Sequence, residues 1–144
     1  MPSIKQLCIP RPVIFDPQKR DTVLDLNDLV ADRIDPAAFF EENFITEGMQ
    51  TLLKYTFDRL EGRSAQGVFK LRQAMGGGKT HNLLALGLLA RHPEYRQRVM
   101  GQFYTPDPAL GPVKVIAFSG RESDAPLGLW GALAEQLGKR DHFK

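Results

Sequence analysis

Three consecutive glycines, Gly76 to Gly78, are followed at once by Lys79, Thr80 and a long apolar stretch with helical spacing. Glycine has no β-carbon, so it tolerates the tight turns in which backbone N–H groups converge. A helix that begins directly after such a turn points the positive end of its dipole at the same place. The pattern therefore predicts an anion site at the N-terminus of a buried helix.

The residue types in this stretch are those of a P-loop, in which each has a separate task. Backbone N–H groups hold phosphate oxygens, a lysine neutralises the β- and γ-phosphates, and a hydroxyl coordinates Mg²⁺. Here Lys79 is the predicted phosphate lysine and Thr80 the predicted magnesium ligand. We therefore expect a nucleoside triphosphate and Mg²⁺ as cofactors. The candidate binding residues are Met75, Gly76, Gly77, Gly78, Lys79, Thr80 and His81.

Two features of the loop leave alternatives open. The usual P-loop has a glycine five residues before its second one, and Gln73 stands at that position. A glycine turn followed by a chance Lys-Thr pair is the plain structural alternative. His81, in the first turn of the predicted helix, could reach the α-phosphate or the base, or it could be a partly exposed polar residue.

The segments around the loop indicate an α/β protein. GVFKLRQ, residues 67–73, is short and β-prone, and it predicts a strand before the glycines. Residues 79–91 predict an apolar helix, and the nearly continuous apolar run at 113–120 predicts a strand buried on both faces. A last amphipathic helix is expected from residue 128. This order predicts a P-loop NTPase-type parallel sheet with flanking helices.

A helical region is expected before this core. Asp35 can cap a helix whose first residue is Pro36. Thr46 can cap a longer helix that Gly62 ends. One face of that helix is apolar and carries Met49, Leu52, Leu53, Phe57 and Leu60. We therefore divide the chain into an irregular arm at 1–20, a helical region at 21–62 and a partial P-loop nucleotide-binding core at 63–144.

Hydrolysis needs a carboxylate that the sequence does not supply at the expected place. P-loop ATPases hold an acid at the end of a neighbouring strand, but the run at 113–120 ends without one. Glu122 and Asp124 follow it in a polar loop and are interpreted as solvated residues, while Asp25 and Asp28 precede the glycines, which is the wrong chain order. We identify no catalytic residue. The chain is interpreted as an N-terminal piece that binds nucleotide weakly and does not turn it over alone.

Composition excludes several other classes. The chain is 42% hydrophobic and 25% charged, which suits an ordinary globular domain. A net charge of +2 is too mild to argue for nucleic acid by itself. The single cysteine, Cys8, rules out an internal disulfide. With neither a signal peptide nor a run of about 18 apolar residues, we expect a cytoplasmic protein without a membrane partner.

Basic side chains cluster after the predicted P-loop helix and recur near the end of the chain. They could contact DNA, or simply solvate the surface. One arginine could also act on a neighbour's nucleotide in a homo-oligomer. The residues concerned are Arg91, His92, Arg96, Arg98, Arg121, Lys139 and Arg140.

The segments FFEENFITEGMQTLL and MGGGKTHNLLALGLL resemble a group of large bacterial P-loop ATPases, the domain-of-unknown-function family 499 or anti-phage-associated ATPases. The segments IPRPVIFDP and LWGALAEQLG are similar to the same family, whose loop also lacks the early glycine. The resemblance implies ATP as the nucleotide, an AAA+-like core and a glutamate-bearing strand beyond residue 144. It also implies a role in phage defence, with DNA methyltransferases or helicases as partners.

Three functions remain open from the sequence. The chain is part of an ATPase, a nucleotide-dependent scaffold that does not hydrolyse ATP, or a fragment whose loop is vestigial. The first interpretation follows the resemblance, and the second follows the lack of an evident acid.

Overall fold

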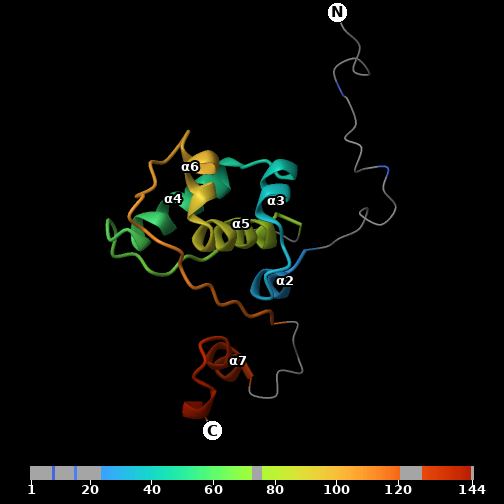
Figure 1. Ribbon diagram of the computed structural model, residues 1–144, viewed down its shortest axis with the longest axis vertical. Helices are drawn as coiled ribbons and strands as arrows, with labels where there is room; N and C mark the ends of the chain where they lie inside the picture. Colours follow the sequence, from blue (N-terminus) through green and yellow to red (C-terminus); the bar gives the residue numbers. More distant parts are fainter. Residues whose placement is uncertain (1–7, 9–14, 16–23, 73–75, 121–127, 144) are drawn as a thin grey trace, which may run out of the picture.

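The computed structural model describes residues 24–72, 76–120 and 128–143, together with residues 8 and 15. Helices α2 to α6 gather into one cluster, and α7 lies apart from it (Figure 1). Apart from Cys8 and Phe15, the arm predicted at 1–20 lies outside the described residues.

Helix α5, Lys79–Arg91, is the centre of the cluster and begins and ends where the sequence predicts. It packs against α2, α4 and α6. Its sequence is apolar on most sides, which is typical of a helix buried within a domain. Four residues on one face are fully enclosed: Leu84, Ala85, Leu88 and Leu89 are at most 1% exposed.

In the part of the chain that the structure describes, three capped helices precede α5. Helix α2 is Leu26–Val30, α3 is Pro36–Glu42 and α4 is Glu47–Leu60. The two predicted caps are confirmed, because Asp35 accepts the N–H of Ala37 and Thr46 accepts the N–H of Met49. On α4, Met49, Leu52, Leu53 and Phe57 of the predicted apolar face are buried, and Leu60 is partly buried.

Gly87 allows a close approach between α2 and α5. A β-carbon at this position would lie 2.3 Å from Cδ2 of Leu29, which is 2% exposed. This close packing is therefore with the side chain of an α2 residue.

The predicted parallel sheet is wrong. None of the described residues forms a β-strand, including residues 67–72 and 113–120, where strands are expected. A strand is stable only with a neighbour that completes its backbone hydrogen bonds. In this chain, the backbone of residues 113–120 is bound by side chains and by the end of a helix instead. The run therefore lies beside α5 as an irregular segment.

Hydrogen bonds from side chains and from the end of α5 take the place of strand pairing in this segment. The side-chain amide of Gln136 donates to the carbonyl of Ala117 at 2.7 Å and accepts its N–H at 2.9 Å. Arg91 donates to the carbonyl of Val115, and the N–H of Val113 donates to the carbonyl of Ala90. The segment is therefore held against α5 and α7 without strand pairing.

The C-terminal elements are helical. The predicted last helix is confirmed as α7, Gly128–Gln136, and the short η2 is Arg140–Phe143. Trp130 on α7 is 68% exposed. Within the part of the chain that the structure describes, no helix has the length and apolar character needed to span a bilayer.

Helix α6 is Pro93–Met100. Its residue Arg96 connects the end of α5 to the segment that follows α6. It is 2% exposed, and its guanidinium donates to the carbonyls of Leu89, Ala90, Leu110 and Gly111. Burial lowers the pKa of Arg96, while Glu61 and Glu94 raise it. Arginine keeps its charge at neutral pH, so one cation satisfies four carbonyl groups.

Replacing Arg96 with methionine is expected to destabilise the fold by about 3 kcal/mol or more, because several buried carbonyls lose their donor. Urea unfolding measures this loss. Arg98→Met is the matched control, since Arg98 is exposed on the same helix and is expected to change stability by about 0.5 kcal/mol. Equal effects of the two substitutions would contradict the structural role of Arg96.

Candidate functional site

The glycine loop (residues 76–78) leads directly into the first turn of α5. Gly76 has a φ of 79° and Gly78, the N-cap residue of α5, a φ of 74°. Both angles lie in the left-handed region that glycine adopts without strain. The N–H of Asn82 donates to the carbonyl of Gly78 at 2.9 Å, so the helix starts at the end of the loop.

The N-terminus of α5 differs from those of α2, α3 and α4. Those three helices begin at Asp25, Asp35 and Thr46, whose side chains accept backbone N–H groups. Gly78 makes no side-chain cap, and the first turn of α5 contains no acidic residue. The positive end of the helix dipole is therefore not neutralised by its own cap or first turn.

Space lies beside the loop. A β-carbon at Gly76 or Gly78 would meet no heavy atom within 4 Å, so these glycines are required by the backbone angle and not by crowding. A hollow of about 210 Å³ borders the loop. One wall is formed by the loop and the first turn of α5, with Gly77, Gly78, His81 and Asn82. The other wall is formed by the α3–α4 connection and the start of α4, with Asn43, Phe44, Thr46 and Met49.

The structure brings most of the predicted site residues together. Lys79 and Thr80 are the first residues of α5; Lys79 is half-buried and Thr80 is exposed. His81 is exposed, and its ring stacks on that of Phe39 with centroids 6.1 Å apart. Met75 lies outside the described residues. The described part of the predicted site is thus contiguous at the N-terminus of α5.

Sequence reasoning missed one wall of the hollow. Asn43, Phe44 and Thr46 border it from the connection between α3 and α4, and Asn82 borders it from α5. Thr46 was assigned only as a helix cap. No local spacing relates the α3–α4 connection to the glycine loop, since only the packing of α4 on α5 places them together.

The described residues place no carboxylate in the lining of the hollow, because none of those that border it is Asp or Glu. Asp25 caps α2 through the N–H groups of Asn27 and Asp28, so its role is structural. Glu122 and Asp124 lie outside the described residues. In the described ranges, no three His, Cys, Asp or Glu side chains are grouped to hold a metal ion.

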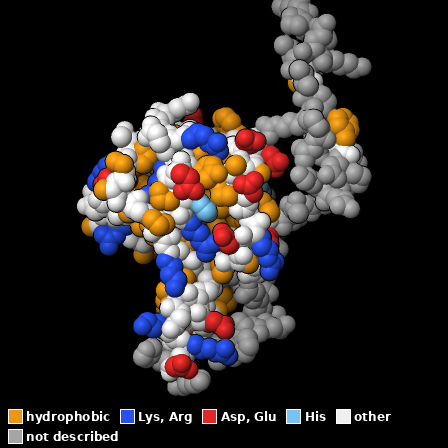
Figure 2. All heavy atoms as spheres, viewed as in Figure 1, with side chains coloured by type: hydrophobic (Ala, Val, Ile, Leu, Met, Phe, Trp, Pro, Cys, Tyr) orange, Lys and Arg blue, Asp and Glu red, His pale blue; other side chains and the backbone are white. Residues whose placement is uncertain are grey.

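Two of the basic residues considered for DNA contact serve the fold. Arg96 is buried, and Arg91 donates to the carbonyls of Leu29 and Val115. Arg98 is exposed and lies over the ring of Tyr95. Figure 2 shows Lys and Arg interspersed with Asp and Glu over the visible face. That face therefore lacks the single-sign stripe expected of a nucleic-acid surface.

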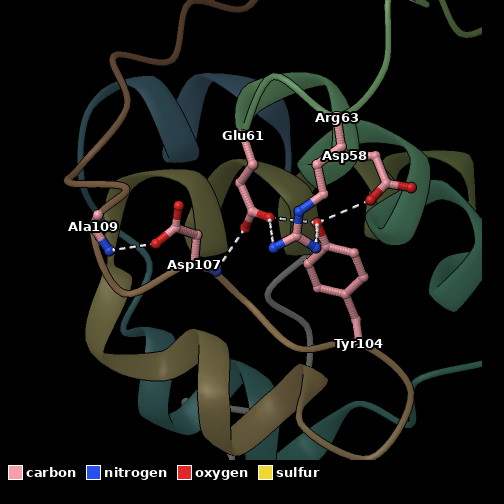
Figure 3. A network of polar contacts seen from close by, with 6 residues as sticks. All are labelled: Asp58, Glu61, Arg63, Tyr104, Asp107 and Ala109. Carbon is pink, nitrogen blue, oxygen red and sulfur yellow. Dashed lines mark hydrogen bonds and ion pairs between the residues drawn. The ribbon is translucent and has the colours of Figure 1, made fainter.

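A second polar cluster joins the end of α4 to the chain after α6 (Figure 3). The hydroxyl of Tyr104 donates to Glu61 at 2.7 Å and lies 3.1 Å from a carboxylate oxygen of Asp58. Arg63 pairs with Glu61 at 2.8 Å and donates to the Tyr104 hydroxyl at 3.2 Å. Glu61 also accepts the N–H of Asp107. Each of the six residues drawn contacts another of them, and these contacts join the end of α4 to residues 104–109, so the cluster fastens two segments together.

The pKa of Tyr104 is raised in this cluster. Burial raises the pKa of its phenol, and the hydrogen bonds and charges of Glu61 and Asp58 raise it further. The folded protein therefore keeps the phenol protonated to higher pH than the unfolded chain does. No residue of the hollow belongs to this cluster, so we assign it to stability and not to the candidate site.

The fold and the site define a small helical domain in which a glycine-rich turn opens a buried central helix. Residues 14–101 match the family model of the DUF499 N-terminal domain, which is more than half of the chain. The chain therefore belongs to the DUF499 family. Comparisons with curated proteins and with solved structures found no match.

Tyr104→Phe is expected to lower stability by about 1.5–3 kcal/mol at pH 7, because Glu61, whose side chain is 1% exposed, loses a donor. Since the folded pKa is raised, the stabilisation is complete below the unfolded pKa of about 10 and is lost as the pH rises above it. The difference between wild type and variant should be constant from pH 7 to 9 and shrink above pH 10.

Denaturant unfolding at several pH values measures that difference. Tyr55→Phe is the control, because Tyr55 is 49% exposed on α4 and is expected to change stability by less than about 0.5 kcal/mol. A difference for Tyr104→Phe that grows above pH 10 would contradict this account.

Proposed function

We propose that this chain binds the triphosphate of ATP, together with Mg²⁺, at the glycine loop and the first turn of α5. The observation that carries the proposal is the pair of left-handed glycines at the N-terminus of a buried helix without a side-chain cap. Such a terminus favours an anion through its N–H groups and its dipole. The family resemblance supplies the choice of ATP.

The residue types fit a magnesium nucleotide. Backbone N–H groups of Gly76, Gly77 and Gly78 would hold phosphate oxygens, and Lys79 would neutralise their charge. The hydroxyl of Thr80, which is exposed in the first turn, would take one position around Mg²⁺. Met75 and His81 complete the proposed binding set. The bound metal would screen the phosphate charge.

The proposed biological role is that of a bacterial ATPase in phage defence, acting in the cytoplasm with DNA methyltransferases or helicases. This part of the proposal rests on the resemblance noted in the sequence. A nucleotide-dependent scaffold that does not hydrolyse ATP is the second candidate. The observation that favours it is that none of the described residues lining the hollow is Asp or Glu.

Lys79→Ala is expected to weaken binding of Mg²⁺-ATP about ten- to hundred-fold, because a charged hydrogen bond to phosphate is lost. Titration calorimetry with ATP and Mg²⁺ measures the change. Lys139→Ala is the matched control, since Lys139 is an exposed lysine beyond α7. Unchanged affinity in Lys79→Ala would remove the phosphate assignment.

Phosphate release from the wild type, measured in the same samples, separates the two candidates. Turnover that Lys79→Ala abolishes would favour the ATPase. Binding without turnover would favour the scaffold.

A further inference from the structure

We infer that the base of the nucleotide occupies the hollow beside the glycine loop and stacks on Phe44, with Asn43 favouring adenine. This inference rests on the proposed function, because it concerns the other end of the same ligand. It assigns a binding role to the connection between α3 and α4, which the sequence motif does not include.

The hollow has the size and position for a base. It shares Gly77 and Gly78 with the phosphate loop and His81 and Asn82 with α5. Its volume of about 210 Å³ is below the roughly 300 Å³ at which pockets for whole ligands begin. It therefore suits one ring system, while the phosphates lie over the loop.

A second hollow of about 530 Å³ also borders Phe44, but none of residues 76–82 is among its lining residues. A nucleotide whose phosphates are held at the loop is therefore adjacent to the smaller hollow and not to the larger one.

Phe44 is the stacking surface that the structure offers there. Its side chain is 85% exposed although Phe39, five residues earlier, is 2% exposed. An exposed aromatic ring at the wall of a hollow offers a face on which a base can stack. Thr46 and Met49 continue the same wall, so one side of the hollow is formed by the start of α4.

Asn43 supplies a polar contact with a defined orientation. Its amide NH₂ donates to the carbonyl of Phe39 at 2.8 Å, which fixes which end of the side chain is the oxygen. The amide oxygen is an acceptor, and the 6-amino group of adenine is a donor. Hypoxanthine has an oxygen in place of that amino group, so the pairing predicts that ATP binds more tightly than ITP.

The test compares Mg²⁺-ATP, Mg²⁺-ITP and Mg²⁺-tripolyphosphate as calorimetric ligands of the full chain. In the wild type, ATP is expected to bind at least ten-fold more tightly than tripolyphosphate and about three- to ten-fold more tightly than ITP. Phe44→Ala is expected to weaken ATP binding about ten- to hundred-fold and to leave tripolyphosphate binding within two-fold. Tyr55→Ala, which removes another exposed aromatic ring, is the control and should change neither.

The outcomes separate this inference from the function on which it rests. If tripolyphosphate binds and Lys79→Ala weakens it, but Phe44→Ala leaves ATP affinity unchanged, the base site is refuted and the phosphate site stands. Equal affinity for ATP and ITP would refute the role given to Asn43. If neither ATP nor tripolyphosphate binds the wild type, both assignments fall.

Discussion

Burial of α5 is the interaction on which the rest of the structure depends. Each leucine of the enclosed face contributes about 1.5–3 kcal/mol, so Leu84, Leu88 and Leu89 together outweigh any single helix cap at about 0.5–2 kcal/mol. Packing against α2, α4 and α6 therefore fixes the helix, and its ends are positioned as a consequence. Arg96 then fixes one end, and Gly87 allows α2 to approach the middle.

The functional proposal follows from what this packing leaves at the other end. The core holds the first turn of α5 in place, while Gly78 supplies no side chain to neutralise it. The start of α4 is carried to the same place because α4 packs on α5. The packing of α4 on α5 thus brings the glycine loop close to the opposite wall of the hollow, which includes Phe44. A ligand at the proposed site would meet walls that this packing has already brought together, which would reduce the ordering cost of binding.

Local signals in the sequence predicted the helices well. The cap contacts from Asp35 to Ala37 and from Thr46 to Met49 involve residues two and three positions apart, so neighbouring residues determine them. The two predicted strands failed because strand formation depends on a partner segment. The run at 113–120 has the composition of a buried strand, but Gln136 and Arg91 bind its backbone and it packs on α5. Apolar composition overestimated the burial of this run, since residues 113–120 are half-buried or exposed, and it predicted strand pairing incorrectly.

The candidate site could be predicted only in part for the same reason. Residues 76–81 are consecutive, so the motif gave their grouping and the structure placed the loop at the start of α5. Asn43 and Phe44 reach the site through the packing of two helices, and a single sequence holds no local signal for that contact. The structural roles of Arg91 and Arg96 were likewise not evident from a cluster of basic residues in the sequence.

Backbone amide NMR during titration with Mg²⁺-ATP tests the central claim most directly. The account predicts saturable shifts of the amide signals of Gly76, Gly77, Gly78, Lys79 and Thr80, with signals from α7 unchanged. Shifts confined to other parts of the chain, or loop signals that stay fixed at saturating nucleotide, would contradict it.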